Sequence, residues 1–198
     1  GEGFDLDADG EIDNALWPLG AALDPIIAER LATAQHVAIE QVAGLDDFAN
    51  DEVVRVGVAT AEDPDGDGTN NGSGAESFAG GAAVDAEGNV LVTTETALEA
   101  GTFTVALATG SLPVGSYVLE LATGLWISAQ PTIAGETGLM GVGVSIDALT
   151  TALEAEGMDA DVIGALVELA DLDLDGDGEA DAVSMAFTFE AAPCGLVP

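Results

Sequence analysis

The sequence predicts a mainly β fold with flanking helices, arranged as an antiparallel β-sandwich or barrel. Apolar and polar residues alternate in short segments separated by glycine- and aspartate-rich turns, which is typical of these folds. Helical spacing of apolar residues occurs in two regions, near the start and near the end of the chain. Because 48% of the 198 residues are hydrophobic, the chain can bury a sizeable core.

An N-terminal helical region is predicted over residues 15–34, where apolar residues recur at helical spacing. These residues are Leu16, Leu19, Leu23, Ile26, Ile27 and Leu31. Pro18 and Pro25 interrupt the pattern. Each proline is expected near a helix start, because the first turn of a helix does not need the N–H group that proline lacks.

The β body is predicted over residues 36–146. Its predicted strands are residues 37–42, 53–59, 76–84, 90–94, 101–108, 116–123, 125–131 and 139–146. Turns rich in glycine or aspartate are expected at residues 45–52, 85–89, 111–115, 123–124 and 135–138. Alternation predicts that Val54, Val56 and Val58 share one face of their strand.

The C-terminal region is predicted to contain two helices, an acidic loop and a last strand, at residues 147–156, 159–170, 171–181 and 182–191. Asp147 is expected at the N-cap of the first helix, where its carboxylate can accept from free N–H groups. No long linker is present, so residues 1–198 are predicted to form a single β-rich domain. Its parts are an N-terminal loop and helix (1–35), the β body (36–146) and the C-terminal region (147–198).

The charge is strongly one-sided, with 37 acidic residues against two basic ones, Arg30 and Arg55, and a formal net charge of −35. Nucleic acid is excluded as a partner because its phosphates would be repelled. Bound divalent cations would offset the self-repulsion of the folded chain, and high ambient salt would screen it. No run of about 18 apolar residues occurs, so no transmembrane helix is expected.

Two segments, residues 5–13 and 173–181, share the pattern D-x-D-x-D-G-E-x-D. Calcium takes roughly 6–8 oxygen ligands, and carboxylates at positions 1, 3 and 5 of a curled loop point toward such an ion. Glycine at position 6 permits the sharp turn, position 7 offers its carbonyl, and position 9 binds directly or through water. The candidate ligands to Ca²⁺ are Asp5, Asp7, Asp9, Glu11, Asp13, Asp173, Asp175, Asp177, Glu179 and Asp181.

A third candidate loop lies at residues 63–71 and has the same ligand spacing. Its candidate ligands are Asp63, Asp65, Asp67, Thr69 and Asn71. A solvated turn explains this composition equally well. The acidic residues within 46–52 lack the ligand spacing and are expected to form a solvated turn.

These loops resemble the calcium loops of EF-hands, dockerins and thrombospondin type 3 repeats over about ten residues each. They depart at position 12, where an EF-hand has a bidentate glutamate and this chain has Leu16 and Ser184. A remote residue or water is therefore expected to complete the coordination. Residues 5–14 and the strand-rich body also resemble uncharacterised secreted proteins or lipoproteins of myxobacteria-like bacteria. That resemblance implies an extracellular or cell-surface location.

No catalytic set is evident, so the chain is not expected to be an enzyme. His36 is the single histidine and no G-x-S-x-G motif accompanies it. Cys194 is the single cysteine, so no disulfide can form within the chain, and pairing with another chain stays open. Trp17 and Trp126 could stack on sugars, although core packing is the simpler expectation for both.

The preferred hypothesis is a secreted or surface calcium-binding protein with a structural or adhesive role, in which calcium stabilises the fold. Self-assembly into a homo-oligomer or filament is a further expectation. The alternative is a module that binds a carbohydrate or another small ligand in a calcium-dependent manner. A hydrolase that uses a carboxylate pair is a third possibility, for which the sequence identifies no pair.

Overall fold

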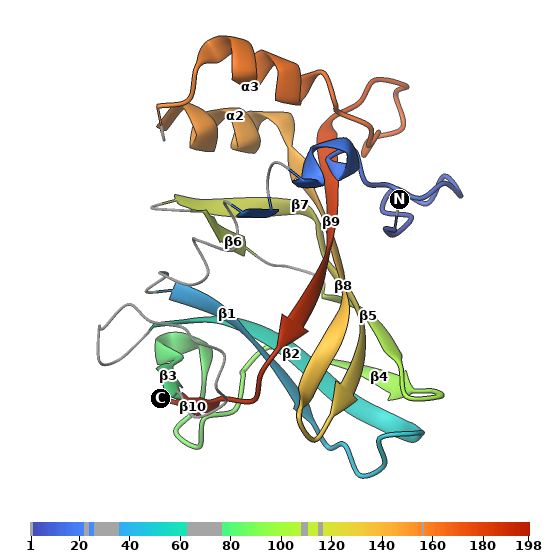
Figure 1. Ribbon diagram of the computed structural model, residues 1–198, viewed down its shortest axis with the longest axis vertical. Coiled ribbons are helices and arrows are strands. Elements are labelled where there is room, and N and C mark those ends of the chain that lie inside the picture. Colours follow the sequence, from blue (N-terminus) through green and yellow to red (C-terminus); the bar gives the residue numbers. More distant parts are fainter. Residues whose placement is uncertain are drawn as a thin grey trace. The chain divides into compact units, whose positions relative to one another are not determined.

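Figure 1 shows a computed structural model of the 198-residue chain. It describes residues 2–21, 24–25, 36–62, 77–107, 111–114, 117–155 and 157–198. The third candidate loop, with Asp63, Asp65, Asp67, Thr69 and Asn71, lies outside these residues. Most of the predicted N-terminal helical region also lies outside them.

The described chain is mainly β, as predicted, and its strands form two five-stranded sheets. The first sheet contains β1 (His36–Ala43), β2 (Asp51–Glu62), β3 (Ser77–Ala79), β4 (Thr94–Leu98) and β10 (Gly195–Val197). The second contains β5 (Phe103–Leu107), β6 (Ser111–Val114), β7 (Tyr117–Thr132), β8 (Gly135–Ser145) and β9 (Ala182–Ala191). Among the described strands neither sheet closes on itself, which favours the predicted sandwich over a barrel.

The order of strands is β1-β2-β3-β10 in the first sheet, where β4 also pairs with β2. In the second sheet the order is β5-β7-β8-β9, and β6 pairs with β7. β1 and β2 pair antiparallel without a break, from His36 opposite Glu62 to Ala43 opposite Arg55. β10, a short strand that the sequence did not predict, pairs with β3 in parallel.

The chain divides into two compact units, and both contain buried apolar residues. One unit comprises Gly1–Ala21, Ala108–Trp126 and Leu139–Thr188, and we call it the loop unit. Its buried apolar residues are Leu125, Val142, Val144, Leu149, Ala152, Ile163, Leu172, Ala182 and Val183. The other unit, the strand unit, comprises Ala22–Leu107, Ile127–Gly138 and Phe189–Pro198. Its core includes Val54, Val56, Ala61, Phe78, Leu98, Phe103, Val105 and Ile127.

Alternation located β2 correctly but not its full length. Val54 and Val56 are fully buried, whereas Val53 is 51% exposed, as the alternation requires. Beyond Gly57 the buried positions become Ala59 and Ala61, so the pattern changes phase. A side chain at Gly57 would collide with the backbone of Val92, which explains why glycine is found there.

The predicted strands at residues 76–84 and 90–94 are largely replaced by other structure. Among the described residues of the first range, Ser77–Ala79 alone is a strand, and the 3₁₀ helix η2 (Gly81–Ala83) follows it. In the second range Val90 forms an isolated bridge with Val84, and β4 begins at Thr94. The backbone N–H of Val90 donates to the side chain of Gln41 rather than to a strand partner, which explains the interruption.

Three predicted turns are in fact parts of strands. Residues 111–114 form β6, whose pairing with β7 provides the hydrogen bonds. Gly124 lies within β7 and adopts a positive φ of 76° without ending the strand. Residues 135–138 belong to β8, because the reversal of the chain occurs earlier, at Ile133 and Ala134.

Two helices precede β9 and lie side by side, α2 (Ile146–Ala155) and α3 (Ala160–Val167) (Figure 1). Ser145, and not Asp147 as predicted, caps α2, because the N–H of Ala148 donates to its Oγ at 3.2 Å. Near the N-terminus, Pro18 lies in the first turn of the 3₁₀ helix η1 (Trp17–Leu19), as predicted. Within the described ranges no helix combines the length and apolar character needed to cross a bilayer.

Candidate metal centre

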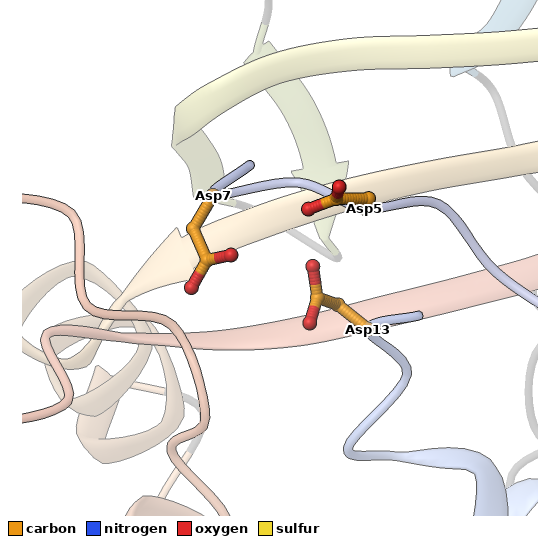
Figure 2. A group of neighbouring side chains, drawn as sticks. All are labelled: Asp5, Asp7 and Asp13. Atoms are coloured by element: carbon orange, nitrogen blue, oxygen red, sulfur yellow. The ribbon is translucent and has the colours of Figure 1, made fainter. Parts of the chain in front are cut away.

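The first aspartate loop brings three of its five predicted ligands together. One carboxylate oxygen from each of Asp5, Asp7 and Asp13 lies within 4.8 Å of the others. Figure 2 shows the three carboxylates pointing toward one another from the two arms of the loop. Asp13 is buried, with 7% of its surface exposed, and the other two are half-buried. Three hard oxygen donors converging in this way could hold a metal ion.

The second loop repeats this arrangement at the same three positions. One oxygen from each of Asp173, Asp175 and Asp181 lies within 4.8 Å of the others. Positions 1, 3 and 9 of the shared pattern therefore converge in both loops. Two segments that lie far apart in the sequence have folded into the same constellation.

Hydrogen bonds inside the loops show that the two backbones also follow the same path. In the first loop four N–H groups donate to carboxylates: Leu6 to Asp13 (2.5 Å), Asp9 to Asp7 (3.2 Å), Gly10 to Asp5 (3.1 Å) and Glu11 to Asp9 (2.8 Å). In the second loop the equivalent bonds are Leu174 to Asp181 (3.0 Å), Asp177 to Asp175 (3.1 Å), Gly178 to Asp173 (2.8 Å) and Glu179 to Asp177 (2.9 Å). These bonds curl each loop and direct the carboxylates of positions 1, 3 and 9 inward.

Two positions in each loop adopt the left-handed backbone conformation that this path requires. Position 6 is glycine in both loops, with φ of 93° at Gly10 and at Gly178. Position 4 is Ala8 in the first loop, with φ of 66°, and Gly176 in the second, with φ of 77°. These angles confirm that the glycine at position 6 permits the sharp turn. Ala8 adopts a left-handed conformation that is energetically unfavourable for alanine.

The residue before each loop anchors it to the sheet. The Phe4 ring lies against Gly141 of β8, where a side chain would collide with it, and also contacts Trp126 with ring centroids 5.8 Å apart. Leu172 is fully buried and lies in the same way against Gly143, two residues further along β8. Because residues two apart share a strand face, both loops dock on one face of β8.

Hydrogen bonds join the end of the first loop to β9, which follows the second loop directly. The side chain of Asn14 donates to Ala186 O (3.2 Å) and accepts from Ala186 N (3.1 Å). The N–H of Ala15 donates to Oγ of the buried Ser184 at 2.8 Å. The Ser184 hydroxyl and N–H in turn donate to Asp171. Ser184 occupies position 12 of the second loop and acts here as a connector between segments.

Uncompensated negative charge is concentrated in the first loop. Burial raises the pKa of Asp13, the Leu6 N–H opposes this shift, and the charges of Asp7, Asp171 and Asp9 raise the pKa further. Asp5 Oδ1 is buried and receives no hydrogen bond from the described residues. A cation bound by the three carboxylates would offset both features, which is the fit expected of a metal site.

The remaining predicted ligands in these loops lie outside the two converging groups. Asp9 and Glu11 are exposed in the first loop, and so are Asp177 and Glu179 in the second. At position 5, Asp9 and Asp177 each accept the N–H of position 7. Their role as ligands stays a prediction, as does the backbone carbonyl of position 7.

In two other acidic turns the aspartate carboxylates accept local hydrogen bonds and belong to neither converging group. Asp51 accepts from the N–H groups of Asp46 and Val53, and these bonds lower its pKa. Asp85 accepts from the side chain and backbone of Asn89 and from the N–H of Glu87, which lower its pKa. These turns are stabilised by local hydrogen bonds, as expected of solvated turns.

The expectation of core packing is confirmed for one tryptophan and not for the other. Trp126 is half-buried against Phe4, in agreement with a packing role. Trp17 is 60% exposed, so the expectation of core packing was wrong for this residue. Cys194 is exposed, and His36 is the first residue of β1.

Comparison with known proteins gives no relative from which a function could be transferred. No family model matches the chain, and neither a curated protein nor a solved structure matches it.

Proposed function

We propose that this chain is a secreted or cell-surface structural protein whose fold is stabilised by calcium bound at the loops of residues 5–13 and 173–181. The observation that carries the proposal is the duplication of one loop geometry. Both loops gather the carboxylates of positions 1, 3 and 9, with four equivalent hydrogen bonds and matching positive φ angles. A single acidic turn could arise from composition alone. Two turns with matching geometry favour a site for the same kind of ion in each loop.

The donor set favours calcium over other ions. Each site offers three carboxylates, and the carbonyl of Glu11 or Glu179 and water can complete a shell of roughly 6–8 oxygens. Magnesium prefers a tighter octahedron and keeps its water, and transition metals prefer imidazole or thiolate donors. A divalent cation would also offset part of the net charge of −35.

Calcium at these loops would join segments that lie far apart in the sequence. Ordering residues 5–13 fixes Asn14 and Ala15, which hydrogen-bond to Ala186 and Ser184 of β9. Ordering residues 173–181 fixes Asp171 and the start of β9 itself. The two ions would therefore hold the N-terminal segment and β9 together within the loop unit, which suits a structural or adhesive role.

A second candidate function is calcium-dependent binding of a carbohydrate. The observation that favours it is Trp17, which is 60% exposed and follows the first loop by four residues. An exposed indole ring beside a calcium loop offers a flat apolar surface on which a sugar ring can stack. Binding to a glycan array that requires both calcium and Trp17 would favour this function, and equal binding by Trp17→Ala would exclude it.

Thermal unfolding in calcium and in EGTA tests the preferred function. At a free concentration one hundred times Kd, each site adds about 2.7 kcal/mol to the free energy of unfolding. We expect calorimetric titration to find at least two calcium ions per chain and EGTA to lower the melting temperature. Magnesium serves as the control for a general charge effect. A melting curve that EGTA leaves unchanged would exclude the proposal, and size-exclusion chromatography under both conditions would reveal any calcium-dependent assembly.

A further inference from the structure

Two glutamates that belong to neither aspartate loop, Glu40 and Glu136, interact with each other inside the strand unit. Glu40 lies on β1 in the first sheet, and Glu136 is the second residue of β8 in the second sheet. Both belong to the strand unit. They follow no sequence motif, because the pair forms only when the two sheets fold.

Glu40 lies on the face of the first sheet that carries the buried side chains of Val54 and Val56. Residues directly opposite one another in an antiparallel pair share a face, and Glu40 is opposite Val58 while Val42 is opposite Val56. Because residues 40 and 42 also share a face, Glu40 lies on the same side as Val56, which is fully buried. A charged group in this position lacks the water that normally solvates it.

The two carboxyl groups lack donors from the rest of the described chain. Glu40 Oε1, Glu40 Oε2 and Glu136 Oε1 are buried, and no N–H or hydroxyl group among the described residues donates to them. Arg55, the one arginine in the described ranges, is exposed on β2. Buried polar groups are ordinarily hydrogen-bonded, so this pair requires an explanation. A proton held by one carboxyl group would supply the missing donor.

The electrostatics of the pair agree with a retained proton. Burial, and then the negative charge of Glu136, raise the pKa of Glu40 from 4.5 to about 8. Burial also raises the pKa of Glu136, to about 7, and its interaction with Glu40 opposes that rise. Among the described residues, each glutamate is the charged group that acts on the other.

We propose that Glu40 and Glu136 form a proton-dependent latch between β1 and the tip of the β7–β8 hairpin. With one proton between them, one carboxyl group donates to the other and the buried pair carries a single negative charge. When that proton leaves, two like charges face each other without water or a counter-charge. The latch is closed at acid and neutral pH and opens in alkali.

The direction of the pH dependence follows from the two raised pKa values. A group whose pKa is higher in the folded than in the unfolded protein contributes stability that is complete below the unfolded value. Here that value is 4.5, and the contribution is lost as pH rises through about 7 to 8. The free energy of unfolding and the hydrogen-exchange protection of residues 36–43 and 132–138 should therefore fall between pH 6 and 9.

Hydrogen exchange of the full chain at saturating calcium and fixed ionic strength tests the latch. The variants are Glu40→Gln and Glu136→Gln, and the control is Glu52→Gln, which changes an exposed glutamate on β2. Protection factors, which correct for the intrinsic pH dependence of exchange, are compared at pH 6 and pH 9. Wild type and the control should lose protection at β1 and the hairpin tip by about tenfold or more per pH unit as the pH rises from 6 to the higher pKa of about 8, and the two latch variants should lose less.

Protection that is equally pH-dependent in the latch variants, or pH-independent in the wild type, would overturn the proposal. Should a variant fail to fold, the carboxyl ¹³C shifts of the wild type decide the question alone. Titration of Glu40 well above 4.5 supports the latch, and titration near 4.5 refutes it. Because calcium is held constant, either outcome leaves the calcium proposal unaffected.

Discussion

The loops at residues 5–13 and 173–181 follow the same backbone path but differ in how far each satisfies its own carboxylates. In the second loop Asp173 accepts three backbone N–H groups, from Gly176, Asp177 and Gly178. In the first loop Asp5 accepts one, from Gly10, and its Oδ1 is buried without a donor among the described residues. The two loops therefore differ in how much of their carboxylate charge is offset by hydrogen bonds.

Position 9 differs in the same direction. Asp13 is buried and its pKa is raised, first by burial, whereas Asp181 is half-buried. The first loop thus concentrates more uncompensated negative charge, and it gains more from a bound cation. Identical ligand patterns therefore do not imply equal dependence on the ion. The first loop should be the more strongly affected when calcium is removed.

The largest expected effect comes from neutralising position 9 in each loop. Asp13→Asn keeps an oxygen for the Leu6 N–H but removes a ligand charge, so in calcium it should lose one ion and about 2.7 kcal/mol at a hundredfold excess over Kd. In EGTA the same variant should be more stable than wild type, because it removes a buried charge that Asp7, Asp171 and Asp9 repel. Thermal melts in both conditions measure the two effects.

Asp181→Asn is the matched control for the opposite effects on stability that Asp13→Asn should have in calcium and in EGTA. It should also lose one calcium ion, but in EGTA its melting temperature should stay close to that of wild type, because Asp181 is half-buried. An equal rise in melting temperature for both variants in EGTA would show that the two loops do not differ in uncompensated negative charge. Unchanged calcium stoichiometry in both variants would show that position 9 is not a ligand.

A smaller effect is expected at position 4, where the loops differ in sequence. Gly176→Ala places a side chain at φ of 77° and should cost about 1–2 kcal/mol of unfolding free energy, with no change in calcium stoichiometry. Ala8→Gly relieves the same strain at φ of 66°, although the gain is reduced by about 0.4–1 kcal/mol of unfolded-state entropy. Urea titration of both variants measures the difference, and a stabilising Gly176→Ala would contradict the strain argument.

The sequence predicts best where local pattern and tertiary structure agree. Residues 182–191 form β9 as predicted, and alternation identified β1 and the buried positions Val54 and Val56. The repeated aspartate pattern predicted two matching loops, because its glycine at position 6 and its spaced carboxylates are local requirements.

Features that depend on distant partners could not be predicted in this way. β10 has three residues and exists because β3 offers it a parallel partner. Gly124 signals a turn in isolation, but β7 continues through it once its strand partners are in place. The sequence shows only that Ser184 replaces the position-12 glutamate of an EF-hand, whereas in the fold its hydroxyl joins Asp171 to Ala15. In each case the deciding contact lies far away in the sequence.

The smallest effect is expected at position 5, where the pattern and the geometry disagree. The D-x-D-x-D-G resemblance implies that Asp9 and Asp177 are ligands, but both are exposed and lie outside the converging carboxylates. If positions 1, 3 and 9 hold the ion, then Asp9→Asn and Asp177→Asn should keep calcium stoichiometry and change stability by about 0.5 kcal/mol or less. Isothermal titration of these variants beside Asp13→Asn distinguishes the two ligand sets. Loss of an ion in Asp9→Asn would mean that the loop closes further around calcium and that position 5 then joins the ligands, as the pattern implies.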